Sequence, residues 1–235
     1  MQQSHEDLAQ RLAAVRQRMQ AAAQRSGRRA DSVRLVAVTK GVAAARIREA
    51  MALGVLDFGE NRVQEALPKI AALGPGPRWH LVGHLQRNKV RRAVEAFALI
   101  HSLDSLPLAE AISRRAEAAG RWVEVLLQVN VAGEPRKHGF APAEVPQAVR
   151  HIAGLPALIL RGLMTIAPLE ADPQRVRPVF RRLRELRDAL RVQWPGLEEL
   201  SMGMSDDFEV AIEEGATLVR VGRAIFRERP LPPST

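Results

Sequence analysis

The segment Arg34-Leu35-Val36-Ala37-Val38-Thr39-Lys40-Gly41 contains the first of several similar strand patterns in this chain. An apolar run from Arg34 to Thr39 has the length and the β-branched content of a buried strand, and it ends at a lysine and a glycine. Comparable runs follow at 55–58, 79–82, 97–102, 122–129, 157–163, 197–201 and 217–221. The sequence therefore predicts eight short strands.

Helical patterns separate these strands, at 43–53, 61–72, 86–94, 107–119, 142–152, 173–192 and 206–214. Strict alternation of strand and helix implies right-handed parallel crossovers, and eight repeats close a barrel. We therefore expect an α/β fold, a single-domain (β/α)8 TIM barrel spanning residues 1–228. An open doubly wound sheet is the alternative, but the turn after the first strand lacks the glycine-rich pattern that binds a dinucleotide.

The two ends of the chain differ from the repeating part. Leu8, Leu12, Val15 and Met19 form one apolar stripe, and Ser4 and Asp7 have capping-box spacing, so a helix is predicted at about 4–25. Residues 229–235 are rich in proline and are expected to form a C-terminal tail.

The composition excludes several classes of protein. The 235 residues carry a net charge of +9 but no cysteine and no tyrosine, and aromatic residues make up 4%. Most arginines between 175 and 191 alternate with apolar residues at helical spacing, which indicates a solvated helix face, so we expect no specific nucleic-acid partner beyond loose attraction to polyanions. With a polar N-terminus and no apolar run of membrane length, we expect a soluble, cytoplasmic protein with no membrane partner.

Lys40 is the candidate reactive residue. The chain contains 35 Lys+Arg, but only four of them are lysines, and Lys40 stands at the end of an apolar strand. A desolvated lysine amine is suited to imine formation with an aldehyde. The alternative is a lysine that only extends its charged end into solvent.

A phosphate site is predicted opposite this lysine. In such barrels the loops after strands seven and eight often bind phosphate, and here they offer the hydroxyl of Ser205 and the backbone amides of Gly222 and Arg223. An amine facing a phosphate site indicates a phosphorylated aldehyde, and pyridoxal 5′-phosphate (PLP) is the expected cofactor. Arg220 would then face the pyridine nitrogen. The alternatives are a helix cap for Ser205, tight packing for Gly222, and an ion pair of Arg220 with Glu213 or Glu214.

Other polar residues near the strand ends have ordinary explanations. His80 and His84 flank the end of one strand, which is poor spacing for a metal pair. Glu60 and Glu65 are expected to support the first turns of the following helix. Lys137 is a loop cation that could take part in cofactor entry or exit.

Several segments together resemble the pyridoxal phosphate homeostasis protein family. They are Val38-Thr39-Lys40, Asp57-Phe58-Gly59-Glu60-Asn61, Trp79-His80-Leu81-Val82-Gly83-His84, Arg161-Gly162-Leu163-Met164, Leu200-Ser201-Met202-Gly203-Met204-Ser205-Asp206-Asp207 and Val219-Arg220-Val221-Gly222. The resemblance implies a barrel similar to the N-terminal domain of alanine racemase.

The same resemblance implies roles for particular residues. It implies that Lys40 forms an internal aldimine with PLP, that Ser205 and the amides of Gly222 and Arg223 hold the phosphate, that Arg220 faces the ring nitrogen and that Asn61 lies near the ring. Two positions depart from the pattern of many members: Gly41-Val42-Ala43 follows the lysine where they continue with Thr-Lys-Pro, and Arg223 replaces a threonine.

The expected function is to hold and transfer PLP without strong catalytic activity. A cationic Arg220 disfavours protonation of the pyridine nitrogen and so weakens the ring as an electron sink. His84, His138 and Lys137 are the only candidate acids or bases on the open face, and the sequence shows no orienting partner for them. The alternatives are a weak PLP-dependent amino-acid racemase and a Schiff-base aldolase acting on a sugar phosphate. Partners would be PLP and PLP-dependent apoenzymes, and the helix stripes suit a monomer or a homodimer.

Overall fold

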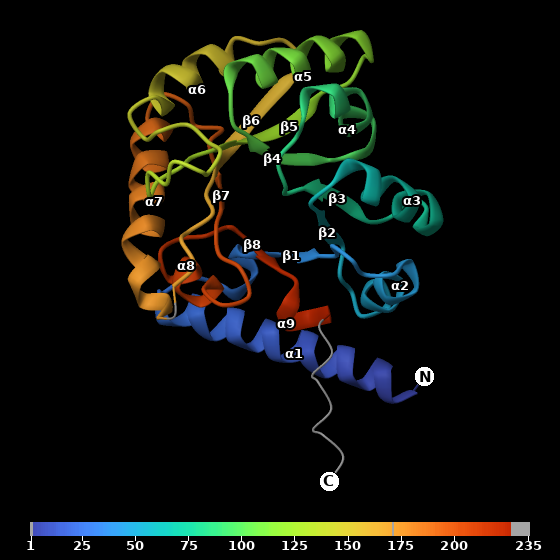
Figure 1. Ribbon diagram of the computed structural model, residues 1–235. Coiled ribbons are helices and arrows are strands. Elements are labelled where there is room, and N and C mark those ends of the chain that lie inside the picture. Colours follow the sequence, from blue (N-terminus) through green and yellow to red (C-terminus); the bar gives the residue numbers. More distant parts are fainter. Residues whose placement is uncertain (1, 171, 227–235) are drawn as a thin grey trace.

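The computed structural model describes residues 2–170 and 172–226, so the predicted tail at 229–235 lies outside the described residues. Eight parallel strands close into a barrel in the order β1 to β8 (Figure 1). This confirms the TIM barrel. The strands are β1 (Arg34–Val38), β2 (Asp57–Glu60), β3 (Arg78–Leu81), β4 (Leu99–Leu103), β5 (Val123–Gln128), β6 (Leu158–Met164), β7 (Glu199–Ser201) and β8 (Leu218–Val221).

Helices between the strands form the outer layer of the barrel (Figure 1). They are α2 (Ala44–Ala52), α3 (Val63–Leu73), α4 (Val90–Ala96), α5 (Leu106–Ala118), α6 (Val145–Ala153), α7 (Arg177–Arg191) and α8 (Phe208–Glu213). The helices expected at 86–94 and 173–192 each begin as a 3-10 turn, η2 (Arg87–Lys89) and η3 (Pro173–Val176). Before α7 the reason is Pro178, which has no amide hydrogen to continue the hydrogen bonding of the preceding turn.

Helix α1 (Gln2–Arg25) completes the outer layer. It packs against α8, α2 and the short α9 (Arg223–Phe226), which has only four residues and cannot cover the seam between β8 and β1. The predicted stripe faces this seam, with Leu8, Leu12 and Val15 all buried. The helix begins two residues before Ser4, so the predicted capping box does not mark its start.

The hydrophobic core has two parts. The larger part lies between the helices and the outer face of the barrel, and a smaller cluster of Val36, Val82, Leu99, Leu126, Met164 and Leu218 is separate from it. Polar residues are buried among the strands as well: His101 on β4 hydrogen-bonds Ser201 on β7. Because β4 and β7 are not neighbours in the sheet, this bond crosses the barrel interior.

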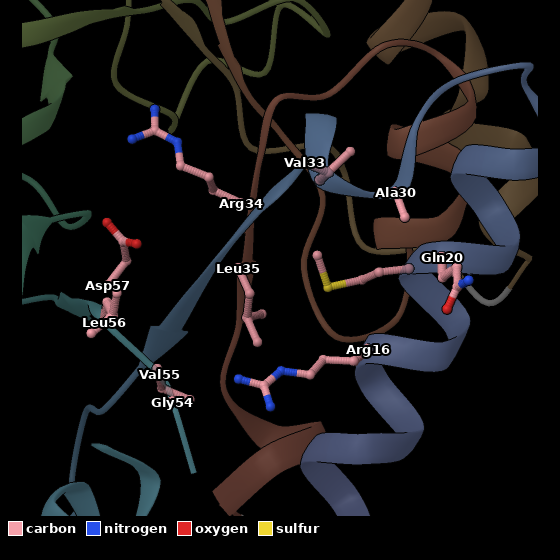
Figure 2. Close-up of a pocket in the computed structure, with 11 residues that line it drawn as sticks. Arg16, Gln20, Ala30, Val33, Arg34, Leu35, Gly54, Val55, Leu56 and Asp57 are labelled. Carbon is pink, nitrogen blue, oxygen red and sulfur yellow. The ribbon is translucent and has the colours of Figure 1, made fainter. Parts of the chain in front are cut away.

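The two ends of the barrel each have a cavity. At the end where the strands start, a cavity of about 380 Å³ lies between α1 and the beginnings of β1 and β2. Figure 2 shows Arg16 reaching into it from α1, while the charged ends of Arg34 and Asp57 point away from that helix. None of the helices described here combines the length and the hydrophobicity that crossing a bilayer requires.

Candidate functional site

A second cavity, of about 490 Å³, lies at the end of the barrel where the strands finish. Its volume is in the range of small-molecule sites. The carboxyl ends of β1, β2 and β8 and the loop after β7 supply its walls. All six site residues predicted from the sequence line it: Lys40, Asn61, Ser205, Arg220, Gly222 and Arg223.

Lys40 stands at the rim of this cavity. Its side chain is exposed, and no described residue forms a hydrogen bond or ion pair with its amine. The expectation that this lysine is desolvated is therefore wrong. What distinguishes Lys40 is that its amine has no partner among the described residues and that it lines the cavity.

The backbone on both sides of Lys40 is held by the next strand and helix. Lys69 Nζ donates to the carbonyl of Thr39 at 2.7 Å, and the amide of Gly41 donates to Glu65 Oε1 at 2.6 Å. Lys69 also pairs with Glu60 at 2.7 Å and with Glu65 at 3.1 Å. Glu60, Glu65 and Lys69, which we call the strand-end clamp, therefore restrain the residues that flank the free amine.

Glu60 is the buried member of the strand-end clamp. Its side chain is 0% exposed, it accepts from the hydroxyl of Thr39 at 2.5 Å, and its Oε2 has no hydrogen-bond partner among the described residues. Desolvation raises the pKa of Glu60, although hydrogen bonds from Lys69 and Thr39 oppose the rise. Glu60 does not contact the first turn of α3 as expected; its carboxylate pairs with Lys69, which lies further along the same helix.

Arg220 lies at the bottom of the cavity, with 4% of its surface exposed. Its Nη1 donates to Ser201 Oγ at 2.6 Å and its Nη2 to the carbonyl of Thr165 at 2.9 Å. Burial lowers the pKa of Arg220 to about 10, and the charge of Asp207 acts in the opposite direction. The guanidinium therefore stays cationic at neutral pH.

The alternative partners considered for Arg220 belong to another cluster. Glu214 pairs with Arg177, Arg181 and Arg184 of α7, at 3.0 to 3.1 Å. Glu213 pairs with Arg25 and Arg177. The alternative interpretation, an ion pair of Arg220 with either glutamate, is therefore wrong.

The residues after β7 and β8 meet across the cavity. Ser205 Oγ accepts a hydrogen bond from the amide of Ala224 at 3.3 Å, whereas Asp207 occupies the N-cap position of α8. The helix-cap interpretation of Ser205 is therefore wrong. Arg223 directs its exposed guanidinium away from the backbone turn, to the carboxylate of Asp206.

Two glycines bring strand ends close enough to shape this cavity. A Cβ on Gly222 would lie 3.0 Å from the carbonyl of Val38, so the packing interpretation of Gly222 holds in addition to its place in the cavity. A Cβ on Gly83 would lie 2.3 Å from the carbonyl of Asn61. Arg62, not Asn61, is the N-cap residue of α3, so the capping interpretation of Asn61 is wrong.

A smaller cavity of about 300 Å³ adjoins the first and shares Asn61, Val82 and Ile166 with it. His84 and His138 lie there, and His84 Nδ1 is 2.8 Å from Asp104 Oδ2. His84 thus has an orienting carboxylate, contrary to the interpretation from sequence. Lys137, at the same edge, pairs with Glu134 at 2.5 Å and donates to the carbonyl of Ala167.

The histidines do not combine as a metal pair. His80 is buried and contacts Asp57 and His101, whereas His84 is exposed and contacts Asp104. Among the described residues, His84, Asp104 and His138 group closely, but the two imidazole rings stack at 4.0 Å with an interplanar angle of 11°. A metal ion between parallel rings would lie outside both ring planes, where imidazole nitrogen has no lone pair.

Sequence reasoning missed the residues that support the site rather than line it. Lys69 contacts Thr39, and Asp104, Ser201 and His101 likewise contact residues distant in sequence, so no local motif predicts these contacts. One signal was available for Lys69, because it is one of only four lysines in an arginine-rich chain.

Comparison with known proteins places the chain among relatives with the same architecture. The alanine racemase N-terminal domain family matches residues 10–230. A pyridoxal phosphate homeostasis protein from Aquifex aeolicus is 46% identical over 222 residues, covering 94% of this chain and 97% of that protein. The protein of the same name from Escherichia coli strain K12 is 40% identical over 227 residues, covering 95% of this chain and 97% of that protein.

Solved structures agree with these relatives. PipY of Synechococcus elongatus PCC7942, solved with PLP bound, is 42% identical, with a TM-score of 0.82 and coverage of 93% of this chain and 99% of that one. An alanine racemase from Clostridium difficile 630 is 16% identical, with a TM-score of 0.76, and covers 96% of this chain and 57% of that one. The racemase likeness concerns the fold alone.

Proposed function

Since this chain belongs to the family of pyridoxal phosphate homeostasis proteins, we propose that it binds PLP in the 490 Å³ cavity and acts in PLP homeostasis. The observation that carries the proposal is the meeting, in one cavity, of an unpaired lysine amine, a buried arginine and a glycine turn beside a serine hydroxyl. PLP supplies an aldehyde, a pyridine ring and a phosphate, and these groups match the amine, the cation and the turn respectively.

Each of the six predicted site residues has a role in this proposal. Lys40 provides the amine that bonds covalently to the cofactor's aldehyde carbon, because its Nζ has no partner within the described chain. Ser205 and the backbone amides of Gly222 and Arg223 hold the phosphate. Arg220 faces the ring nitrogen, and Asn61 lies beside the ring. The guanidinium of Arg223 contributes little, since it is exposed and paired with Asp206.

The role of carrier fits the chemistry of Arg220. A guanidinium with a pKa of about 10 remains charged at neutral pH and disfavours a second positive charge on the adjacent ring nitrogen. An unprotonated ring is a weaker electron sink, so carbanion chemistry is poorly supported. The relatives carry a name that describes homeostasis and not catalysis.

Borohydride reduction tests the covalent role of Lys40. The purified full chain is incubated with PLP, its visible spectrum is recorded, and the reduced protein is mapped by mass spectrometry. We expect the adduct on Lys40, its loss in Lys40→Ala, and its retention in Lys89→Ala, which changes a lysine outside the cavity. An adduct confined to Lys69, Lys89 or Lys137 would contradict the assignment.

Transfer of the cofactor is the second part of the proposal. PLP-loaded protein should restore activity to the apo form of a PLP-dependent enzyme. The control is the same apoenzyme supplied only with the free PLP that the loaded protein releases across a dialysis membrane. We also propose a cytoplasmic location, where such apoenzymes would be met. Restoration no faster than by the dialysed PLP would contradict direct transfer.

The position of His84 supports a second candidate function, a weak racemase-type activity. Its imidazole is oriented by Asp104 and lies in the adjoining cavity, which would allow it to move a proton at the open face of the site. Deuterium incorporation at the α-carbon of amino acids in heavy water, absent from Lys40→Ala and reduced in His84→Gln, would favour this candidate over a pure carrier.

A further inference from the structure

A chain of hydrogen bonds between buried side chains crosses the barrel from Arg220 to the opposite end. Arg220 Nη1 donates to Ser201 Oγ at 2.6 Å, and Ser201 Oγ lies 2.8 Å from Nδ1 of His101. Nε2 of His101 lies 2.9 Å from Nδ1 of His80, and Nε2 of His80 lies 2.9 Å from Oδ1 of Asp57. All five residues are buried.

These residues come from five different strands. Arg220 is on β8, Ser201 on β7, His101 on β4, His80 on β3 and Asp57 on β2. Asp57 is the first residue of its strand and lines the cavity at the other end of the barrel, where Figure 2 shows its carboxylate. We call this set the interior chain. It connects the two cavities through side chains alone.

The hydrogen atoms of the interior chain can be placed by elimination. The guanidinium only donates, so Ser201 Oγ accepts from it, and of the two described partners of this hydroxyl only Nδ1 of His101 can accept its hydrogen. That ring then carries its hydrogen on Nε2 and donates to Nδ1 of His80. His80 in turn carries its hydrogen on Nε2 and donates to the carboxylate of Asp57. Every bond therefore runs in one direction, with both imidazoles neutral.

The electrostatics of both ends agree with this arrangement. Desolvation by complete burial is the main cause that lowers the pKa of His101 well below its ordinary value, so this ring is neutral. Burial alone would raise the pKa of Asp57, but hydrogen bonds from His80 and Arg78 outweigh it and lower the pKa. Asp57 is therefore an ionised acceptor.

Reversing the chain would leave a buried group without a partner. If His80 donated from Nδ1, His101 would have to donate from its own Nδ1 to Ser201 Oγ, which already accepts from Arg220. The hydroxyl hydrogen of Ser201 would then lose its acceptor. A buried polar hydrogen without an acceptor is destabilising, and Nε2 of His80 would also face the carboxylate of Asp57 without a hydrogen, so both ends of the interior chain select the same direction.

We infer that Asp57, His80, His101 and Ser201 are positioning residues for Arg220. The carboxylate of Asp57, at the end of the barrel where the strands start, determines the hydrogen bonding of the guanidinium in the cavity where the strands finish. The inference rests on the proposed function only in that Arg220 is the residue facing the cofactor ring. The interior chain itself needs no ligand, so it can be tested in the unliganded protein.

Nitrogen-15 NMR of the unliganded protein tests the direction of the hydrogen bonds in the interior chain. We expect His80 and His101 to carry hydrogen on Nε2 and none on Nδ1. In Asp57→Asn, the carboxamide can donate to His80, so both rings should gain a population protonated on Nδ1, and the Nε resonance of Arg220 should shift. Glu124→Gln is the matched control, because Glu124 lies at the same end of the barrel and pairs with Arg161, and neither residue belongs to the interior chain.

Two results of this experiment would overturn the inference. One is the finding that His80 or His101 of the wild-type protein carries its hydrogen on Nδ1. The other is an Arg220 resonance that moves no more in Asp57→Asn than in Glu124→Gln.

A second measurement uses the PLP-loaded protein. Ser201→Ala removes the acceptor of Arg220, so we expect the nitrogen-15 resonance of the bound ring nitrogen to shift relative to wild type. Ser113→Ala is the matched control. Ser113 lies on α5, is also buried, and donates to the carbonyl of Pro156, so it does not contact the interior chain. Equal ring-nitrogen shifts in both variants would refute positioning through Ser201. Failure of the wild type to bind PLP would refute the proposed function, and the histidine measurement would still decide the inference.

Discussion

Lys40 and Lys69 carry the same amine in opposite surroundings. Lys40 is exposed and without a partner in the described chain, whereas Lys69 lies between Glu60, Glu65 and the carbonyl of Thr39. An amine held by two carboxylates and a carbonyl is immobile and is not available to a ligand, so it is a poor nucleophile. The division of roles between these two lysines is therefore set by their partners and not by their residue type.

Lys69→Met tests the strand-end clamp. The substitution leaves the carboxylate of Glu60 buried without its cation, which should reduce the free energy of unfolding by about 3–5 kcal/mol. The pKa of Glu60 is already raised by burial and should rise further without Lys69. A raised folded-state pKa means that the folded protein binds the proton more tightly, so stability should recover as the pH falls through that pKa.

Denaturant unfolding at several pH values measures this effect. Lys137→Met is the control, because Lys137 pairs with the partly exposed Glu134 and should change stability by less than about 1 kcal/mol. A loss of stability in Lys69→Met that is the same at pH 5 and pH 8 would contradict the assigned role of Glu60.

At the scale of elements, the ends of β2 and β3 approach each other through a glycine. The missing Cβ of Gly83 allows the carbonyl of Asn61 to lie where a side chain would otherwise be. Asn61 in turn lines both cavities at this end of the barrel. The spacing of two strand ends thus determines where a predicted cofactor residue stands.

Gly83→Ala should separate these strand ends. A methyl group 2.3 Å from the carbonyl of Asn61 cannot be accommodated without backbone movement, and we expect a loss of about 1–3 kcal/mol in stability together with weaker PLP binding. Thermal unfolding and a PLP titration would measure the two effects. Gly196→Ala is the control, because a Cβ there meets no atom within 4 Å. Equal behaviour of the two variants would show that the contact does not constrain the site.

For the whole molecule, closure of the outer layer depends on the first helix of the chain. Arg18 of α1 pairs with Glu209 at 2.7 Å, and its guanidinium lies 4.6 Å from the ring centroid of Phe208, both on α8. Arg25 pairs with Glu213. Helix α1 therefore joins the beginning of the chain to its last repeat.

Leu12→Ala should consequently destabilise the entire barrel and not only α1. Leu12 is 1% exposed in the core, and truncation of such a leucine costs about 2–5 kcal/mol. Gln17→Ala, on the exposed face of the same helix, should change stability by less than about 0.5 kcal/mol. Circular dichroism and tryptophan fluorescence should report one shared unfolding transition in Leu12→Ala; separate transitions would mean that α1 unfolds independently.

The repeating part of the sequence was sufficient to predict the architecture. Each strand is a short apolar run and each helix has an apolar stripe, and these local patterns follow from the burial of one face of each element. The order of the eight repeats then requires a closed parallel barrel, which the structure confirms. Because strand ends converge at one face of a barrel, the residues after the strands were also expected to meet, and the six named residues do line one cavity.

The surroundings of those residues depend on contacts between distant parts of the chain. The sequence predicted a desolvated Lys40 and left an ion pair of Arg220 with a glutamate open as an alternative, but the structure exposes the first and joins the second to Ser201 and Thr165. Hydrogen-bond partners are selected by the distances between strands that closure of the barrel brings together. Sequence alone thus determined the fold and the group of residues at its mouth, whereas only the tertiary structure decided which of their charged groups are paired.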